Sequence, residues 1–221
     1  IVTSLGTVLL PRAAYYIEHQ QMDEFQKLSR KALNFVFIIA SPMMIYFILF
    51  AKQGIFFLSG DAFAPAVVPM QLIMPTLLLI GITNILGIQI LVPLGYEKAV
   101  LVSEIVGAVI DLVVNALLIP VYQSSGAAIG TLLAEFAVMV VQCIALKNEI
   151  KTAFSDIKYL KIILAIIIAS LASFWVTALN LHVFITLVIS AILFFGVYGL
   201  VLIIMKEKLV IEILTQIFSK L

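Results

Sequence analysis

The sequence predicts an all-α membrane protein whose helices cross the bilayer several times. Apolar residues make up 64% of the 221 residues and charged residues only 11%, whereas soluble domains are about half apolar and a quarter charged. The apolar residues fall into runs of about 20, the length that a helix needs to cross the hydrocarbon core. These runs lack the alternation of barrel strands, and a helix pairs its own backbone groups where lipid cannot.

Six of these runs are long enough to be complete transmembrane spans. They are residues 33–51, 69–93, 100–120, 126–146, 162–180 and 183–205. Residues 1–11 have about half the required length. We interpret them as the end of a truncated seventh helix, so we expect the chain to be the C-terminal part of a longer protein.

The basic residues predict how the spans are oriented. All of the 13 Lys and Arg residues except Lys52 lie in alternate connections. These connections are residues 12–32, 94–99, 147–161 and 206–221. Cytoplasmic loops carry the excess of Lys and Arg, so this set, including the C-terminus, is predicted to face the cytoplasm.

Two of the predicted cytoplasmic stretches are amphipathic. The tail 206–221 contains a polar stripe at helical spacing, formed by Lys208, Glu212, Thr215, Gln216 and Ser219. In 12–32 an apolar face is formed by Met22, Phe25, Leu28 and Ala32, and Asp23 precedes Lys27 by four residues, the spacing of a helical ion pair. We expect both to be surface helices that anchor the topology, and the tail to lie in the membrane interface.

Three acidic residues fall inside predicted spans, where charge is costly. They are Glu104, Asp111 and Glu135. Glu104, Asp111 and Asn115 share one helix face, because they are 7 and 4 residues apart. Either these side chains line a polar cavity with a protonatable carboxylate, or they are neutral acids hydrogen-bonded to a neighbouring helix.

Other residues in the spans predict helix packing and bending. Gly126 and Gly130 form a small-xxx-small pair for close helix contact. Pro75 and Pro42 remove backbone hydrogen bonds, so they are candidate kinks or hinges. Asn84 and Gln89 are polar residues in the span that contains Pro75, which makes them further candidates for a cavity wall.

Several chemistries are not indicated by the sequence. His occurs only as His19 and His182, both in connections, so we expect no metal site. The sequence has no GxxxxGK[ST] loop, and its connections leave little room for a catalytic domain. We therefore expect no enzyme activity, no cofactor and no nucleic-acid partner.

Three segments resemble the C-terminal lobe of bacterial polysaccharide flippases. They are TVLLPRAAYY (7–16), followed by a span with Ser41-Pro42; FLSGDAFAPAVVPMQLIMP (57–75); and VVNALLIPVYQSSGAAIGTLLAE (113–135). The third is similar to that family's block with Asn115, Ile119-Pro120, the glycine-rich turn and Glu135 in this order. The family belongs to the multidrug/oligosaccharidyl-lipid/polysaccharide exporter superfamily, which has the MATE-like fold.

The resemblance implies two six-helix lobes around a central cavity, with two extra helices at the C-terminus. Residues 1–146 would form most of the second lobe, 147–161 a cytoplasmic connection, 162–205 the extra pair and 206–221 the tail. The implied activity is the flipping of polyprenyl-diphosphate-linked oligosaccharide repeat units across the bacterial cytoplasmic membrane by alternating access. The implied partners are that lipid-linked substrate, membrane lipids, the missing N-terminal lobe and a polysaccharide polymerase.

Three alternatives remain open at this point. A cation-coupled multidrug exporter of the same superfamily would share the fold. An integral-membrane polysaccharide polymerase or ligase would need a large outward loop with catalytic residues. A scaffold without transport activity would need Asp111 and Glu135 for folding only.

Overall fold

The computed structural model describes residues 2–147, 154–155, 157–179 and 181–218. All regular structure in these ranges is helical, so the predicted all-α class is confirmed. The helices are α1 (Val2–Glu18), α2 (Met22–Leu49), α3 (Ala51–Ser59), η1 (Asp61–Ala66), α4 (Val67–Ile73), α5 (Thr76–Asn84), η2 (Ile85–Leu91), α6 (Glu97–Tyr122), α7 (Ser124–Leu146), α9 (Tyr159–Phe174), η3 (Trp175–Leu179), α10 (Val183–Ile204) and α11 (Lys208–Phe218).

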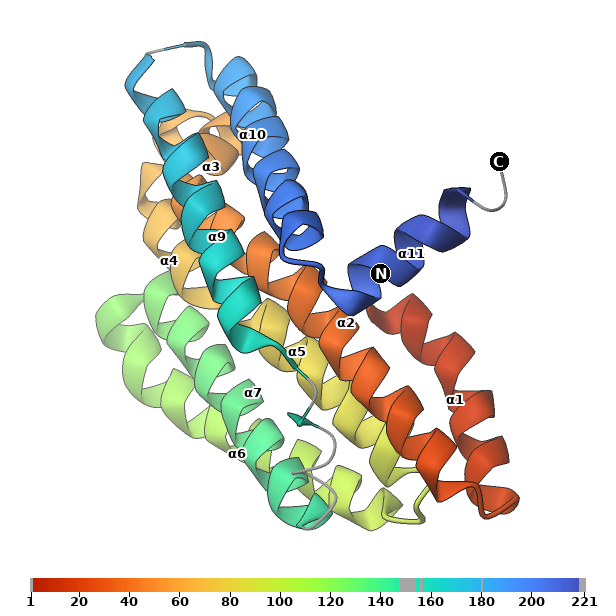
Figure 1. Cartoon of the computed structure of the whole chain (residues 1–221). Coiled ribbons are helices and arrows are strands. Elements are labelled where there is room, and N and C mark those ends of the chain that lie inside the picture. The colour runs from red at the N-terminus through yellow and green to blue at the C-terminus, as the bar shows by residue number, and fades with distance from the viewer. Residues whose placement is uncertain (1, 148–153, 156, 180, 219–221) are drawn as a thin grey trace. The chain divides into compact units, whose positions relative to one another are not determined.

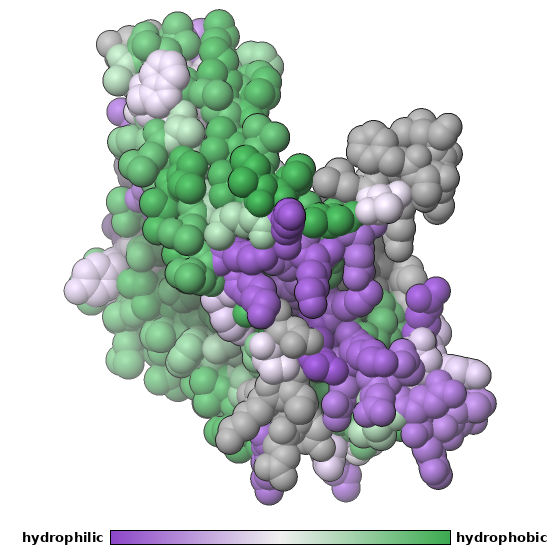
Figure 2. Space-filling model, in the orientation of Figure 1, coloured by the Kyte–Doolittle hydropathy of each residue, from purple (hydrophilic) through white to green (hydrophobic). Residues whose placement is uncertain are grey.

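Six helical segments of the described chain are long and apolar enough to cross a membrane, as predicted. They are Met22–Leu49, Asp61–Leu91, Glu97–Tyr122, Ser124–Leu146, Tyr159–Leu179 and Val183–Ile204. Figure 2 shows that the visible face of α9 and α10 is almost entirely hydrophobic, whereas hydrophilic side chains gather where α1 ends and α2 begins. The hydrophobic face of α9 and α10 is suited to contact with lipid, and the hydrophilic turn between α1 and α2 is suited to contact with water.

The chain forms two compact units. Unit 1 contains residues 1–40 and 72–157, and unit 2 contains residues 41–71 and 158–221. Residues 41–71 therefore pack with the C-terminal helix pair, which differs from a division of the chain at residue 146. Residue 1, residues 148–153 and 156 of the predicted connection, and residues 219–221 of the predicted tail lie outside the described part.

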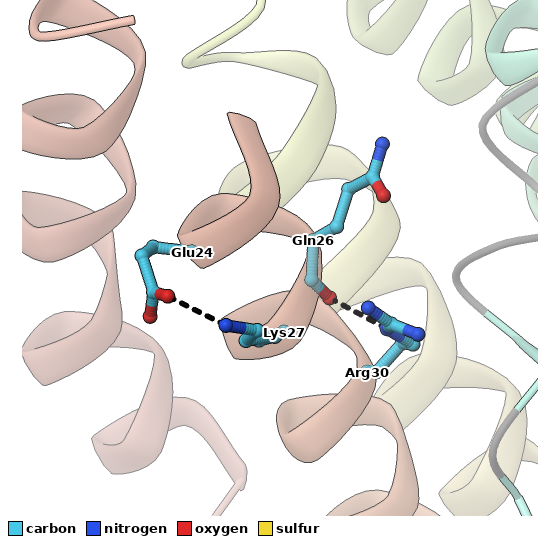
Figure 3. A network of polar contacts seen from close by, with 4 residues as sticks. All are labelled: Glu24, Gln26, Lys27 and Arg30. Carbon is cyan, nitrogen blue, oxygen red and sulfur yellow. Dashed lines mark hydrogen bonds and ion pairs between the residues drawn. The ribbon is translucent and has the colours of Figure 1, made fainter. Parts of the chain in front are cut away.

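The connection at residues 12–32, where a separate surface helix is expected, is instead formed by the end of α1, a short turn and the start of α2. α1 continues through Pro11 to Glu18, and α2 already begins at Met22, because Gln20 adopts a positive φ of 58° that reverses the chain. The expected pair of Asp23 with Lys27 is also corrected: the Lys27 ammonium contacts Glu24, one turn away, at 2.7 Å (Figure 3). Both side chains are about half exposed, at 59% and 49%, so this pair contributes little to stability.

The two candidate kink prolines have different surroundings. α4 ends at Ile73 and α5 begins at Thr76, so the helix is interrupted at Met74 and Pro75. α2 continues through Pro42 to Leu49. The helix α11, at Lys208–Phe218, lies where the amphipathic tail helix is predicted.

The most extensive helix contact of unit 1 is between α6 and α7, which run side by side (Figure 1). Gln123 reverses the chain between them with a φ of 49°. A Cβ added at Gly126 would lie 2.5 Å from the Leu118 carbonyl oxygen, and one at Gly107 would lie 2.5 Å from Val138 Cγ2. Only glycine permits this approach, so the predicted packing role of Gly126 has a direct geometric cause.

In unit 2, Tyr46 links α2 to α10. Its hydroxyl donates to the Leu187 carbonyl oxygen at 3.0 Å and lies 3.2 Å from Ser190 Oγ. The ring packs against Phe50 and Phe194, which are 1% and 0% exposed. A polar tip with a partner and an apolar body among aromatic rings is how tyrosine is stabilised in a core.

Lys161, near the start of α9, closes the C-terminal end of α10. Its ammonium donates to the carbonyl oxygens of Met205 at 2.6 Å and Lys206 at 3.1 Å, and it lies 3.8 Å from the Glu207 carboxylate. Glu207 is only 2% exposed. The last carbonyl groups of a helix lack backbone partners and attract cations, so Lys161 satisfies this helix end and balances a buried acid.

We expect Gly126→Ala to destabilise the protein by about 1–3 kcal/mol, because the added methyl group would collide with the Leu118 backbone. Gly196→Ala is the matched control, since no described heavy atom lies within 4 Å of a Cβ there and alanine favours helix. Thermal unfolding midpoints of the full-length protein in detergent measure both. Equal midpoints for the two variants would contradict the close contact.

We expect Lys161→Met to cost about 1–3 kcal/mol, because charge-assisted hydrogen bonds are lost. The double variant Lys161→Met/Glu207→Gln should lose less than the sum of the single losses, because both charges are removed together. Exposed Lys158→Met is the control. A double-mutant cycle in the same unfolding assay measures the coupling between Lys161 and Glu207. Strictly additive losses would show that the two charges are not coupled.

Candidate functional site: a polar cavity in unit 1

A cavity of about 220 Å³ lies among the helices of unit 1. It is bounded by α5, η2, α6 and α7. Its lining residues are Ile80, Thr83, Asn84, Gly87, Ile88, Val100, Glu104, Glu135 and Gln142. Five of these nine residues are polar or acidic, although all four bounding segments belong to candidate membrane spans.

A change of helical geometry forms one wall of the cavity. η2 is a π-helix from Ile85 to Leu91 that directly follows α5, and the Val92 amide donates to the Gly87 carbonyl five residues earlier. Such π segments are rare and are frequent at functional sites. Here the change begins directly after Asn84 and places Gly87 against α7, so that both residues line the cavity.

Two carboxylates come from the opposite wall. Glu104 of α6 is exposed, and Glu135 of α7 is half-buried. Neighbouring positions on α6, Ser103 and Gly107, are buried against α7, which leaves Glu104 beside the helix contact. Glu104 and Asp111 are the acidic groups nearest to Glu135, so acidic side chains gather at and beside the site.

A chain of hydrogen bonds fixes the orientation of Gln142. The Ser103 hydroxyl donates to the Val100 carbonyl oxygen at 2.6 Å, so this hydroxyl can only accept from other groups. The Gln142 Nε2 donates to Ser103 Oγ at 3.3 Å. The Gln142 Oε1 finds no hydrogen-bond partner among the described residues, and the bond to Ser103 uses one of the two Nε2 protons.

Gly87 makes room for this amide. Gln142 is 1% exposed, and a Cβ added at Gly87 would lie 3.0 Å from its Nε2. A buried polar atom without a partner is costly, and such atoms call for an explanation, such as a water or a ligand. Gln142 Oε1 is an acceptor of this kind in the wall of a cavity.

Of the six predicted cavity-lining residues, Asn84, Glu104 and Glu135 line this cavity. Asp111 and Asn115 lie further along α6 and do not line it. One side-chain oxygen of each is buried without a hydrogen-bond partner in the described chain, and Asn115 Oδ1 packs where a Cβ of Gly130 would be. Gln89 is 3% exposed and lies on η2, outside the cavity lining.

Three lining or supporting residues were not among the sequence candidates: Gln142, Ser103 and Thr83. Gln142 follows Glu135 by seven residues, two helical turns, and it is a polar side chain within an apolar run. That spacing is the sequence feature that could have identified it. No group of three His, Cys, Asp or Glu residues within the described ranges is arranged to hold a metal ion.

Fold and site together define the class: an all-α, multi-span membrane protein with an acidic, amide-lined cavity among its helices. No family model matches the chain, and no solved structure matches it. It is similar to the uncharacterized membrane protein MJ1068 of Methanocaldococcus jannaschii, with 25% identity over 195 residues. That region covers 88% of this chain but only 38% of the relative, so the chain spans about two fifths of the relative's length.

We expect water to reach this cavity. In a Cys143→Ala background, Glu104→Cys should react with a water-soluble maleimide about tenfold faster than Leu112→Cys, because a thiol needs water to ionise. Leu112 is the control, since it lies on the same helix and is 72% exposed on an apolar surface. Labelling rates in detergent-free membranes measure the difference. Equal rates would mean that the cavity is dry.

Proposed function

We propose that the protein contributes to the translocation of polyprenyl-diphosphate-linked oligosaccharides across the cytoplasmic membrane by alternating access. The observation that carries the proposal is the half-open polar cavity lined by helices long and apolar enough to cross a membrane. A polar cavity within a membrane protein is useful where a polar solute has to cross. An unpaired amide oxygen and two acidic side chains within the predicted spans are costly in a membrane, and such residues are typical of functional sites.

The resemblance to polysaccharide flippases supports the same proposal. Its strongest block, residues 113–135, connects α6 to α7. Within it, Asn115 packs against Gly130, and Glu135 lines the cavity. The block that carries the resemblance thus contributes one contact between α6 and α7 and one residue of the cavity lining.

The proposal extends to location and partners. The C-terminus would lie on the cytoplasmic side, as the lysines predict. Since the matched relative is much longer, the remainder of a full transporter would supply the other part of a translocation path, including cationic groups for the diphosphate. A polysaccharide polymerase would receive the flipped repeat unit.

One observation favours a second candidate, a cation-coupled multidrug exporter. Carboxylates attract organic cations as well as sugar hydroxyl groups, and Glu104 and Glu135 have no lysine or arginine beside them in the cavity lining. This candidate predicts drug sensitivity, rather than loss of surface polymer, when the gene is deleted.

The test is deletion of the full-length gene and complementation with wild type, Glu135→Gln, Asp111→Asn or the control Asp61→Asn. Deletion should abolish surface polysaccharide while lipid-linked repeat units accumulate on the cytoplasmic side. We expect Glu135→Gln to restore at most about a tenth of the polymer, which corresponds to a loss of about 1.4 kcal/mol. Asp61 is exposed on η1, so its variant should complement fully.

Protein levels are measured by immunoblot in each strain. Unchanged surface polymer in the deletion strain would refute flipping. Increased drug sensitivity in that strain would instead support the exporter.

A further inference from the structure

The side chains that line the cavity of unit 1 present more hydrogen-bond acceptors than donors. Glu104 and Glu135 supply carboxylate oxygens, and Gln142 supplies its free Oε1. The Thr83 hydroxyl donates to the Ile80 carbonyl oxygen at 3.2 Å, so it too offers only its lone pairs to a ligand. Among the lining side chains, the donors are the Asn84 amide and the second Nε2 proton of Gln142, since the bond to Ser103 uses only one of the two.

An acceptor-rich cavity selects its ligand by chemistry. A diphosphate has only acceptors and carries negative charge, so it is repelled by two carboxylates. A saccharide carries many hydroxyl donors without charge. Ile80, Ile88 and Val100 complete the lining with apolar surface that can contact the C–H groups of a sugar ring.

The size of the cavity agrees with a ring rather than a single ion. Its 220 Å³ corresponds to about seven water molecules at roughly 30 Å³ each. A dehydrated monovalent ion would occupy about one such volume. Gly87 and the buried Gln142 amide shape the inner wall, so the space is formed by fixed groups of α7 and η2.

We propose that this cavity binds the saccharide part of the lipid-linked substrate and not its diphosphate. This inference rests on the proposed function and assigns one part of the substrate to one site. Sugar hydroxyl groups donate to Gln142 Oε1 and to the two carboxylates. The buried acceptor that lacks a protein partner then gains one.

The experiment compares two probes bound to the full-length protein in lipid nanodiscs. One is the lipid-linked repeat unit extracted from the deletion strain, and the other is plain undecaprenyl diphosphate. Dissociation constants are measured for wild type, Gln142→Met, Glu104→Leu and the control Glu97→Gln. Glu104→Leu guards against misfolding, since Glu104 is an exposed residue of the cavity lining and leucine is a good helix former.

Wild type should bind the sugar-bearing lipid more tightly than the plain one. Each of the two cavity variants should reduce this preference by roughly tenfold, the equivalent of about one well-made hydrogen bond. Their affinity for plain undecaprenyl diphosphate should stay within about twofold of wild type. Glu97 is exposed in the first turn of α6 and outside the cavity lining, so Glu97→Gln should keep the full preference.

Other outcomes overturn the inference and separate it from the proposed function. If wild type binds both lipids equally, or if the variants lose both affinities in parallel, the cavity does not read the sugar, and flipping can still stand. If wild type binds neither lipid, the proposed function fails first. A cation site would give a different result. Sodium chloride would then raise the unfolding midpoint of wild type, but not of Glu104→Leu, relative to choline chloride, and the cavity variants would keep the preference of wild type for the sugar-bearing lipid.

Discussion

The close approach of α6 to α7 is the contact on which the polar site depends. Gly107, Gly126 and Gly130 permit it, because each faces atoms of the partner helix where a Cβ would be. Lipid provides no hydrophobic force between apolar helices, so association rests on such close packing and on a few polar contacts. The Gln142–Ser103 hydrogen bond crosses this contact. Glu104 on α6 and Glu135 on α7 line the same cavity.

The same arrangement explains how unit 1 tolerates acidic residues among apolar ones. Glu104 and Glu135 adjoin a hollow in the protein, where water or a polar ligand can solvate them, whereas the outward residues Leu112 and Leu117 of α6 are 72% and 67% exposed on an apolar surface. Asp111 has a buried oxygen without a hydrogen-bond partner in the described chain. The cost of keeping such groups in a membrane is typical of residues retained for function.

Much of this fold could be predicted because apolar run length is a strong constraint in membranes. The six spans and the glycine contact at Gly126 follow from the sequence, as do Asn84, Glu104 and Glu135 as cavity residues. The π-helix at Ile85–Leu91 could not be predicted, because its residues have no distinct pattern in the sequence. Gln142 was missed for a related reason, because a single amide in an apolar run resembles an ordinary core residue. Only the structure shows that its Nε2 donates to Ser103 and that its Oε1 has no hydrogen-bond partner in the described chain.

Lys161 is relevant both to membrane insertion and to the folded structure. It is synthesised before Glu207 and before the carbonyl groups of Met205 and Lys206 that its ammonium later contacts. Lysines beside a span bias its orientation during membrane insertion, so we expect Lys161 to favour one orientation of the α9 segment before Glu207 is present. In the folded chain the same ammonium contacts Glu207 and the last carbonyl groups of α10, and so connects the two helices.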